Sequence, residues 1–332
     1  MMTKALITII VPTFNRCKNL ALLLNTLLLE LDGLQDKVHI IIGDNASNDE
    51  TPVLTALFKE KYPSAVVLRH AENLGGDENF CRCIDQVKSK YFWIFGDDDL
   101  PKSGTLRGIL KILDDTQADI LYLNSEWKDH ISGSTDGEVI TTLSSNKLNR
   151  LAFARQVNIW FTFISGVIVN FDSLRRLNSE FNQRKFSGTS LVQLGWILPL
   201  LMTGENFQII NQRCILATSG NTGGYKLFTV FGNNLPKILA EECGSGNAEY
   251  RVIMEQLCWS YIPRLLWMNR FSNLGKFESE GVMESMAPLR FSLAYWILMY
   301  PLSCFNKFSS YPFLFIVKLA SKFMTLKNGI FP

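Results

Sequence analysis

The C-terminal end of this 332-residue chain lacks acidic residues altogether. No Asp or Glu occurs from Ser285 to Pro332, although the whole chain carries 31 acidic against 33 basic side chains. The five bases of that end leave 28 bases against 31 acids in the rest, so the formal charge of +2 is the sum of −3 and +5. Because the total charge shows no strong basic excess, we expect no nucleic-acid partner.

Histidine is scarce, and the cysteines do not fall into repeated pairs. The chain has three histidines and seven cysteines. Cys81 and Cys83 are the one closely spaced pair, and without a second pair the sequence does not match the common zinc patterns. The odd number of cysteines, together with an N-terminus that lacks the apolar region and cleavage site of a signal peptide, predicts a reducing, cytoplasmic location.

Long apolar runs are also missing. Residues 291–305 are uncharged but contain Pro301, and residues 311–326 contain Lys318 and Lys322. Both fall short of the roughly 20 clean apolar residues that a membrane-spanning helix needs. The segment 285–332 nevertheless holds eleven aromatic residues and five bases, a composition typical of helices that lie on an anionic membrane surface. We expect peripheral association with the inner face of the plasma membrane; the alternative is an ordinary packed helical subdomain.

Short β-branched runs alternate with helical patterns over the first 125 residues. Strands are predicted at 5–11, 38–42, 65–69, 91–95 and 119–123, and helices at 15–31, 51–61, 77–88 and 103–114, with Asn15 as the first helix cap. This alternation predicts an α/β fold with a mostly parallel central sheet. Further along, we expect a strand at 161–170, a helix at 191–202 and a strand at 207–210.

Polar residues follow each of the first four predicted strands. They are Pro12-Thr13-Phe14-Asn15-Arg16, Asp44-Asn45-Ala46-Ser47, Glu72-Asn73-Leu74-Gly75-Gly76-Asp77 and Asp97-Asp98-Asp99. In an open α/β sheet, ligands bind at the carboxyl ends of the strands, so these residues converge on one edge. Three successive carboxylates repel one another unless a cation lies among them, and hard oxygen ligands suit Mg²⁺ or Mn²⁺. A helix-capping role accounts for one of the three.

Four motifs in order carry a family resemblance. Ile9-Ile-Val-Pro-Thr-Phe-Asn-Arg16, Gly43-Asp-Asn-Ala-Ser-Asn-Asp49, Glu72-Asn-Leu-Gly75 and Trp93-Ile-Phe-Gly-Asp-Asp-Asp-Leu-Pro101 resemble those of family 2 glycosyltransferases of GT-A fold. The resemblance covers residues 5–125, and the Gly-Asp-Asp-Asp form is similar to abequosyltransferase-like enzymes of O-antigen assembly. It implies a nucleotide-sugar-binding half at 1–125, an acceptor-side half at 126–235, and a helical C-terminal region at 236–332 that includes the basic aromatic tail.

The resemblance also implies roles for individual residues. The nucleotide-sugar donor is expected to contact Pro12, Thr13, Arg16, Asp44, Asn73, Gly75, Asn79, Asp97 and Asp98, with Asp44 bonded to the base. The run Asp97 to Asp99 matches the Asp-x-Asp region of the family, which binds the ribose and a divalent ion, Mg²⁺ or Mn²⁺. The usual first acid of that region is Gly96 here, so which two of the three aspartates hold the metal is left open.

The base that takes the proton of the acceptor hydroxyl has no clear match. In inverting enzymes of the family it comes from an acidic pair some 12 residues before the Gly that ends a later helix. Counting back from Gly204 reaches Val192 and Gln193, which are not acids. Glu126, Asp129 and His130, just beyond the fifth predicted strand, are the candidates, and a surface-loop role is an equal alternative for each.

The sequence therefore predicts a metal-dependent, inverting glycosyltransferase. It is expected to transfer a sugar from a nucleotide-diphosphate sugar to a polyprenyl-linked glycan acceptor in cell-surface polysaccharide synthesis. One alternative is a nucleotidyltransferase, which is disfavoured because no Gly-rich, Lys-containing phosphate loop follows the first strand. Another is a non-catalytic family member that binds nucleotide sugars or acts as a scaffold, favoured by the missing acidic pair.

Overall fold

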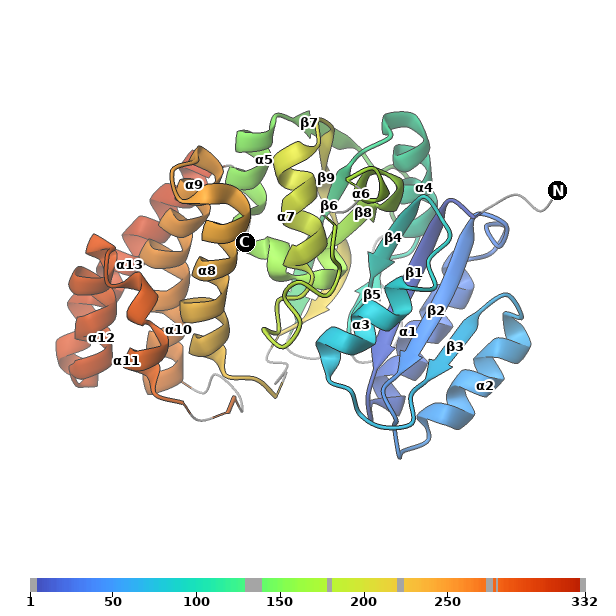
Figure 1. Cartoon of the computed structure of the whole chain (residues 1–332), viewed down its shortest axis with the longest axis horizontal. Coiled ribbons are helices and arrows are strands. Elements are labelled where there is room, and N and C mark those ends of the chain that lie inside the picture. The colour runs from blue at the N-terminus through green and yellow to red at the C-terminus, as the bar shows by residue number, and fades with distance from the viewer. Residues whose placement is uncertain are drawn as a thin grey trace.

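The computed structural model describes residues 5–128, 139–177, 181–219, 224–272, 277–278 and 280–328. The N-terminal α/β half and the C-terminal helices lie at opposite ends of the molecule, with the second half of the sheet between them (Figure 1). The chain order therefore follows the long axis of the molecule.

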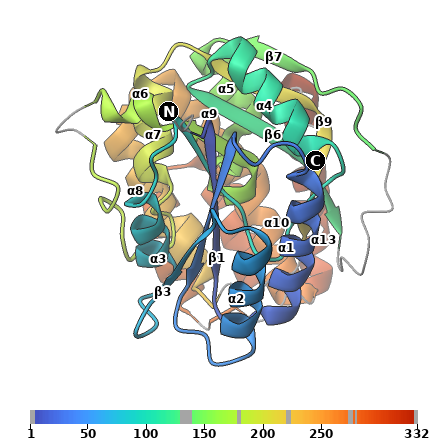
Figure 2. The same ribbon diagram turned by 90° about the vertical axis from the view of Figure 1, so that its right-hand side faces the viewer.

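The N-terminal half is a regular alternation of strands and helices, as predicted. Its elements are β1 (Ile7–Thr13), α1 (Cys17–Glu30), β2 (Val38–Asp44), α2 (Thr51–Lys61), β3 (Val66–Arg69), α3 (Gly76–Ile84) and β4 (Tyr91–Ile94). Neighbouring strands in the order β3-β2-β1-β4 are parallel. Helices α1 and α2 lie on one side of this sheet and α3 on the other (Figure 2).

Both faces of the sheet are buried. Ile9 and Val11 of β1 pack with the leucines of α1, whereas Ile10, which points the opposite way, packs with Ile84 of α3. Successive side chains of a strand alternate between faces, so a parallel strand covered on both sides has to be apolar throughout. This requirement explains the apolar run at 5–11 that identified the strand. Thr8 is the one polar residue in the run, and its buried hydroxyl is hydrogen-bonded to Ser89 Oγ at 2.6 Å.

The second half makes the sheet mixed. It contains β5 (Leu100–Pro101), α4 (Thr105–Thr116), β6 (Ile120–Lys128), β7 (Ser145–Leu148), α5 (Arg150–Val157), β8 (Val167–Asn170), α6 (Phe171–Arg175), α7 (Leu194–Thr203) and β9 (Phe207–Thr218). Strand β8 is antiparallel to β4 and β6, whereas β6 and β9 are parallel. The order β3-β2-β1-β4-β8-β6-β9-β5, with β7 paired to β9, confirms an α/β fold with a mixed central sheet.

The predicted strand at 161–170 is wrong over its first six residues. Two short 3₁₀ turns occupy Asn158–Thr162 and Ile164–Gly166, and the strand is limited to Val167–Asn170. An apolar run of this length does not distinguish a buried strand from buried turns, because both bury consecutive side chains. The strands that were predicted at 119–123 and 207–210 extend further than expected, to Lys128 and Thr218.

The C-terminal region is helical, as predicted. Its segments are Thr229–Asn234, α8 (Leu235–Leu239), Ala240–Gly244, α9 (Ala248–Gln256), Leu257–Tyr261, α10 (Ile262–Phe271), α11 (Val282–Ser285), Ala287–Leu289, Tyr295–Met299, α12 (Tyr300–Cys304) and α13 (Lys307–Asn328). Tyr295, Leu298 and Leu302 are buried in the same apolar cluster as Ile10 of β1. The basic tail is thus part of the folded core. Within the described residues, we find no helix with the length and apolar character to cross a membrane.

One carboxylate joins the first two helices. Asp49 Oδ2 accepts a hydrogen bond of 3.0 Å from the backbone N–H of Cys17 in α1, and its Oδ1 accepts one of 3.0 Å from that of Thr51 in α2. The prediction that Asn15 caps α1 is wrong: Asn15 has a positive φ of 53°, and its Oδ1 accepts from the N–H of Asn48 instead. Burial acts to raise the pKa of Asp49, but the hydrogen bonds from Thr51 and Cys17 outweigh it and lower that pKa.

We predict that Asp49→Ala lowers the free energy of unfolding by about 2 kcal/mol, because it removes one cap from each of two helices at about 1 kcal/mol each. Since the pKa of Asp49 is lowered by folding, the difference from wild type should be present at neutral pH and shrink as the pH falls through the folded-state pKa. Urea unfolding at several pH values measures both effects. Glu50→Ala is the control, because Glu50 makes no side-chain cap bond. Equal stability of the two variants would contradict the double-cap assignment.

Candidate functional site

The carboxyl ends of β1 and β4 bring the acidic triplet, Asp97 to Asp99, against residues that follow the first strand. Thr13 Oγ1 donates a 2.7 Å hydrogen bond to Asp97 Oδ2, and Arg16 Nη1 lies 3.0 Å from Asp97 Oδ1. The same guanidinium nitrogen lies 3.3 Å from Asp98 Oδ2. The structure thus brings together Thr13, Arg16, Asp97 and Asp98, four of the predicted donor-site residues.

Asp99 is held from the other side of the sheet. Its Oδ2 accepts a 2.6 Å hydrogen bond from Ser165 Oγ, and its Oδ1 accepts one of 3.0 Å from the N–H of Thr218 at the end of β9. Thr218 Oγ1 also donates to the carbonyl of Asp98. Segments that are far apart in sequence therefore meet at the triplet.

Gly96 is closely surrounded by the acids that follow it. A Cβ at this position would lie 3.1 Å from Asp99 Oδ2 and 3.2 Å from Asp98 Oδ1, closer than ordinary van der Waals contact. The N–H of Gly96 also donates a 2.9 Å hydrogen bond to Ser165 Oγ. These contacts give a physical reason for a glycine where the family resemblance leads us to expect an acid.

The triplet buries more negative charge than the protein neutralises with the contacts described above. Burial, partly offset by Arg16, raises the pKa of Asp97 to about 6. Burial and then the negative charge of Asp98 raise the pKa of Asp99 to about 7. Of the contacts described above, that of the Arg16 guanidinium brings a positive charge to the triplet, and a further cation would stabilise the charged forms of Asp97 and Asp99, whose pKa values are raised.

The carboxylates do not converge on a single point. Among the described residues, no group of three or more His, Cys, Asp or Glu side chains is arranged to enclose a metal ion. Asp97 turns toward Thr13 and Arg16, whereas Asp98 and Asp99 line a cavity. Two cavity-lining carboxylates suit a divalent ion that takes its other ligands from substrate phosphates and water. The chemistry of Asp98 and Asp99 therefore fits Mg²⁺ or Mn²⁺, whereas both carboxylate oxygens of Asp97 are engaged by Thr13 and Arg16 and Asp97 does not line the cavity.

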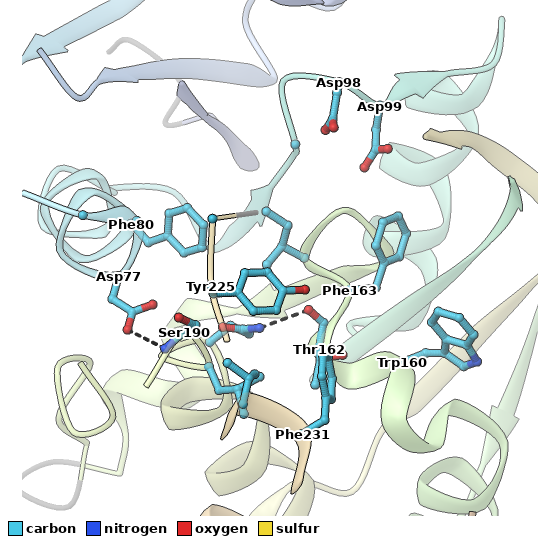
Figure 3. A pocket seen from close by; sticks show the side chains of 18 of the residues that line it. Asp77, Phe80, Asp98, Asp99, Trp160, Thr162, Phe163, Ser190, Tyr225 and Phe231 are labelled. Carbon is cyan, nitrogen blue, oxygen red and sulfur yellow. Dashed lines mark hydrogen bonds between the residues drawn. The ribbon is translucent and has the colours of Figure 1, made fainter. Parts of the chain in front are cut away.

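The cavity has a volume of about 880 Å³ and two chemically different ends. Asp98 and Asp99 lie at one end, and aromatic rings face them across the space (Figure 3). The aromatic residues that line it are Phe80, Trp127, Trp160, Phe163, Tyr225, Phe231 and Tyr261. Several of these rings touch, with centroids 4.9 Å apart for Trp127 and Phe163 and 5.1 Å for Phe231 and Tyr261. We refer to Trp127, Trp160, Phe163, Phe231 and Tyr261 as the aromatic end.

The other predicted donor-site residues lie near this edge, and several are engaged with protein groups. Pro12 lies within β1. The buried carboxylate of Asp44 accepts from the N–H of Ser47 and is paired with Arg69 at 2.9 Å. Asn79 is 2% exposed and donates to the carbonyl of Gly43. Asn73 Oδ1 accepts from Asn45 and from the N–H of Gly75, which has a φ of +80°. Gly75 also lines the cavity.

Of the predicted base candidates, Glu126 is the one that lies among the described residues. Glu126 is paired with Lys102 at 2.7 Å and Lys128 at 3.4 Å and does not line it. The hydrogen bond from Lys102 lowers the pKa of Glu126, which makes it a weaker base. Asp129 and His130 lie outside the described residues. At the position where the family resemblance places an acid, Gln193 lines the cavity and donates to the carbonyl of Thr162.

A carboxylate that we did not single out in the sequence lies beside this position. Asp77, in the first turn of α3, lines the cavity, and its Oδ2 accepts a 3.0 Å hydrogen bond from the N–H of Ser190, shortly before α7 (Figure 3). Burial raises its pKa. The neighbouring Glu78 also lines the cavity but is paired with Arg82 and Arg184. The signal was present, since Asp77 ends the polar stretch at 72–77 that follows the third predicted strand, but its approach to residue 190 depends on the tertiary fold.

Comparison with known proteins links the site to one family. The family model described as Glycosyl transferase family 2 matches residues 8–177. Abequosyltransferase RfbV of Salmonella typhimurium is 36% identical over 120 residues, a stretch that covers 35% of this chain and 34% of that protein. The matched stretch thus spans about a third of the curated relative.

Two solved structures share the fold over nearly the whole chain. S. aureus TarS 1-349 in complex with UDP-GlcNAc superposes with a TM-score of 0.58 at 15% identity, over 98% of this chain and 92% of that one. The mannosyltransferase PcManGT from Pyrobaculum calidifontis, in complex with GDP-Man and Mn²⁺, gives a TM-score of 0.54 at 12% identity, over 97% and 86%. The abequosyltransferase similarity and the family match confirm the resemblance of the motifs.

We predict that Asp99→Asn stabilises the protein in the absence of divalent ions. A carboxyl group whose pKa is raised by folding destabilises the folded state as the pH rises above its unfolded-state pKa. Removing that charge should therefore raise the free energy of unfolding by about 2 kcal/mol at pH 8 and by less at pH 5. Thermal unfolding with and without Mn²⁺ measures the effect: Mn²⁺ should raise the midpoint of wild type and leave that of the variant nearly unchanged.

Glu126→Gln is the control, because it removes an acid that does not line the cavity. It should respond to Mn²⁺ as wild type does. Two results would contradict the assignment of Asp99 as a cation-binding carboxylate. One is an Asp99→Asn variant that melts at a lower temperature than wild type in metal-free buffer at pH 8. The other is a variant whose unfolding midpoint rises with Mn²⁺ as much as that of wild type.

Proposed function

The chain belongs to glycosyl transferase family 2, and from this premise we propose that it transfers a sugar from a nucleotide-diphosphate sugar to a hydroxyl of a lipid-linked glycan. The observation that carries the proposal is that one cavity combines two carboxylates at one end with aromatic rings at the other. The solved structures of similar fold hold UDP-GlcNAc in one case and GDP-Man with Mn²⁺ in the other, which supports a nucleotide-sugar donor and a divalent ion here.

The acidic end is proposed to take the donor. Asp98 and Asp99 would hold the Mg²⁺ or Mn²⁺ ion, with Ser165 and Thr218 fixing the orientation of Asp99. When bound there, the ion stabilises the negative charge that develops on the departing diphosphate. Arg16 is held against Asp97 and Asp98 at the same edge. The nucleotide is proposed to extend from here along the strand ends, past Pro12, Thr13, Asp44, Asn73, Gly75 and Asn79.

The aromatic end is proposed to take the acceptor glycan. Aromatic faces carry partial negative charge and offer flat apolar area, which suits the C–H-bearing faces of sugar rings. The similarity to an abequosyltransferase supports a role in cell-surface polysaccharide of the O-antigen type. A sugar that lies against Trp160 or Phe163 faces the donor across the cavity, so an acceptor hydroxyl can be directed at the anomeric carbon.

We assign proton removal from the acceptor to Asp77. It lines the cavity next to the segment where the family's base is expected, and burial raises its pKa, which strengthens it as a base near neutral pH. Its hydrogen bond to Ser190 fixes the carboxylate in place. With a base on the acceptor side and the diphosphate leaving on the other, the proposed transfer inverts the configuration at the anomeric carbon.

We predict that two carboxylate substitutions separate donor binding from chemistry. Asp98→Asn should weaken binding of the nucleotide sugar with Mn²⁺ and lower transfer by roughly 100-fold or more, and excess chelator should lower wild-type activity to a similar level. Asp77→Asn should lower kcat by about 100-fold or more and leave donor binding unchanged. Calorimetry and nucleoside-diphosphate release with a panel of UDP-, GDP-, CDP- and dTDP-sugars measure the two effects.

Asp36→Asn, an exposed acid far from the triplet in the sequence, serves as the control and should behave as wild type. Full activity in excess chelator contradicts metal dependence. Donor binding by the wild-type chain with no transfer to any acceptor favours the alternative function, a nucleotide-sugar-binding or scaffold protein of the same family.

The C-terminal helices present an exposed apolar surface that we propose lies on the membrane. Phe308, Tyr311, Phe315, Leu319 and Phe323 recur every three or four residues along α13, and their exposed fractions range from 49% to 84%. We call these five residues the tail surface. The bases of 285–332 accompany them without an acid, so the region is complementary to anionic lipid. The proposed location is the inner face of the plasma membrane.

This proposal is best tested by substitution on the surface. Deleting 285–332 would remove Tyr295, Leu298 and Leu302, which are buried in the main core. The deletion would therefore disrupt the fold as well as any membrane contact. We predict that the triple change Phe308→Ser, Phe315→Ser and Phe323→Ser weakens binding to anionic vesicles at least tenfold, because each phenylalanine contributes on the order of 1 kcal/mol. Vesicle co-sedimentation at low salt measures the loss.

The matched control changes three exposed apolar residues of the N-terminal half, Leu29, Val53 and Leu57, to Ser. It should bind vesicles as wild type does, and donor binding should be unaffected in both triple variants. Wild-type protein that stays in the supernatant at low salt, or equal losses in the two triple variants, would overturn the proposed membrane contact.

A further inference from the structure

A second cavity, of about 630 Å³, lies between α10 and α13. One part of its wall is apolar and includes Trp267 of α10 with Leu314 and Val317 of α13. The other part carries three cations, Arg264 from α10 and Lys318 and Lys322 from α13. We call this cavity the tail pocket. No acidic side chain is among the described residues that line it.

The three cations of the tail pocket are exposed on the surface of the protein. Among the described residues, none of the three forms an ion pair with an acid. Three positive groups around one apolar cavity repel one another, and an anion among them relieves that repulsion. A phosphate offers several oxygens to such donors, and charge-assisted hydrogen bonds of this kind are strong. The apolar wall also favours a ligand with an apolar part, which a simple inorganic ion does not have.

The tail pocket is connected to the functional site along one helix. Tyr261, at the aromatic end of the catalytic cavity, is followed at helical intervals by Arg264 and Met268, which both line the tail pocket. Residues three and four apart share one face of a helix, and a rise of 1.5 Å per residue separates Tyr261 from Met268 by about 10 Å along the axis. On its other side, the tail pocket adjoins the tail surface, because Lys318 and Lys322 each lie three residues after Phe315 and Leu319 on α13.

We propose that the tail pocket binds the phosphate of the acceptor lipid, a phosphate or diphosphate carried on a long isoprenoid chain. The inference rests on the proposed function in one respect, namely that the acceptor glycan is lipid-linked. The phosphate lies against Arg264, Lys318 and Lys322, the first part of the chain lies along Trp267 and Leu314, and the glycan extends past Tyr261 into the catalytic cavity. The rest of the isoprenoid enters the bilayer beside the tail surface.

The experiment measures vesicle binding by the full chain, with no donor present. Vesicles of phosphatidylcholine contain either geranylgeranyl phosphate or, at the same surface charge, phosphatidylglycerol. Wild type should bind the prenyl phosphate vesicles about tenfold more tightly than the phosphatidylglycerol vesicles. Lys318→Ala with Lys322→Ala should abolish this preference. Arg290→Ala with Lys307→Ala removes the same charge from the same region outside the tail pocket and should preserve it.

Arg264→Gln on α10 is an independent variant that should also abolish the preference, and thermal unfolding verifies that each variant is folded. Equal binding of wild type to the two lipids would overturn the tail pocket as a binding site. So would an equal loss of the preference in the Lys318/Lys322 and Arg290/Lys307 double variants, because general electrostatic attraction would then explain the binding. A lipid preference in a chain that transfers no sugar contradicts the proposed function alone. Sugar transfer without a lipid preference contradicts the tail pocket alone.

Discussion

The burial of three adjacent carboxylates at the end of a central strand is the constraint from which the features of the site follow. Asp97, Asp98 and Asp99 follow β4, where the parallel half of the sheet meets β8. Burying a carboxylate without compensation is costly, and here Arg16, Thr13, Ser165 and Thr218 supply only part of what water would give. The remaining imbalance is what makes this edge of the sheet suited to a divalent ion and a diphosphate.

The buried triplet also depends on segments beyond the first α/β half. Ser165 and Thr218, which hold Asp99, come from segments 66 and 119 residues further along the chain. The strand that carries Thr218 is placed by β6, and the C-terminal helices supply Phe231 and Tyr261 to the far wall of the cavity. The N-terminal α/β half alone would lack the residues that hold Asp99 and part of the cavity wall. The helical region therefore completes the site as well as the core.

The sequence predicted the parts whose signal is local. Apolar runs that are buried on both faces identified β1, β2 and β4, and the motifs at their ends located the acidic triplet with Thr13 and Arg16. It failed where an interaction depends on tertiary packing. The turns around Ser165 look like a strand because buried residues follow one another there, and the aromatic end is assembled from several distant segments. Asp77 lay in the polar stretch predicted to follow the third strand, but only the fold brings it to Ser190 and the start of α7.

The proposed roles of the two ends of the chain give a physical reason for the separation of its opposite charges. An acidic catalytic edge would be repelled by anionic lipid if it faced the membrane directly, and a basic tail next to the triplet would compete with the metal. The helix α10 lies between them, with the catalytic cavity near its first residue and the tail pocket further along it. A lipid-linked acceptor carries its phosphate at one end and its glycan at the other. In the proposed arrangement, the anionic phosphate contacts the basic tail and the neutral sugar lies near the carboxylates.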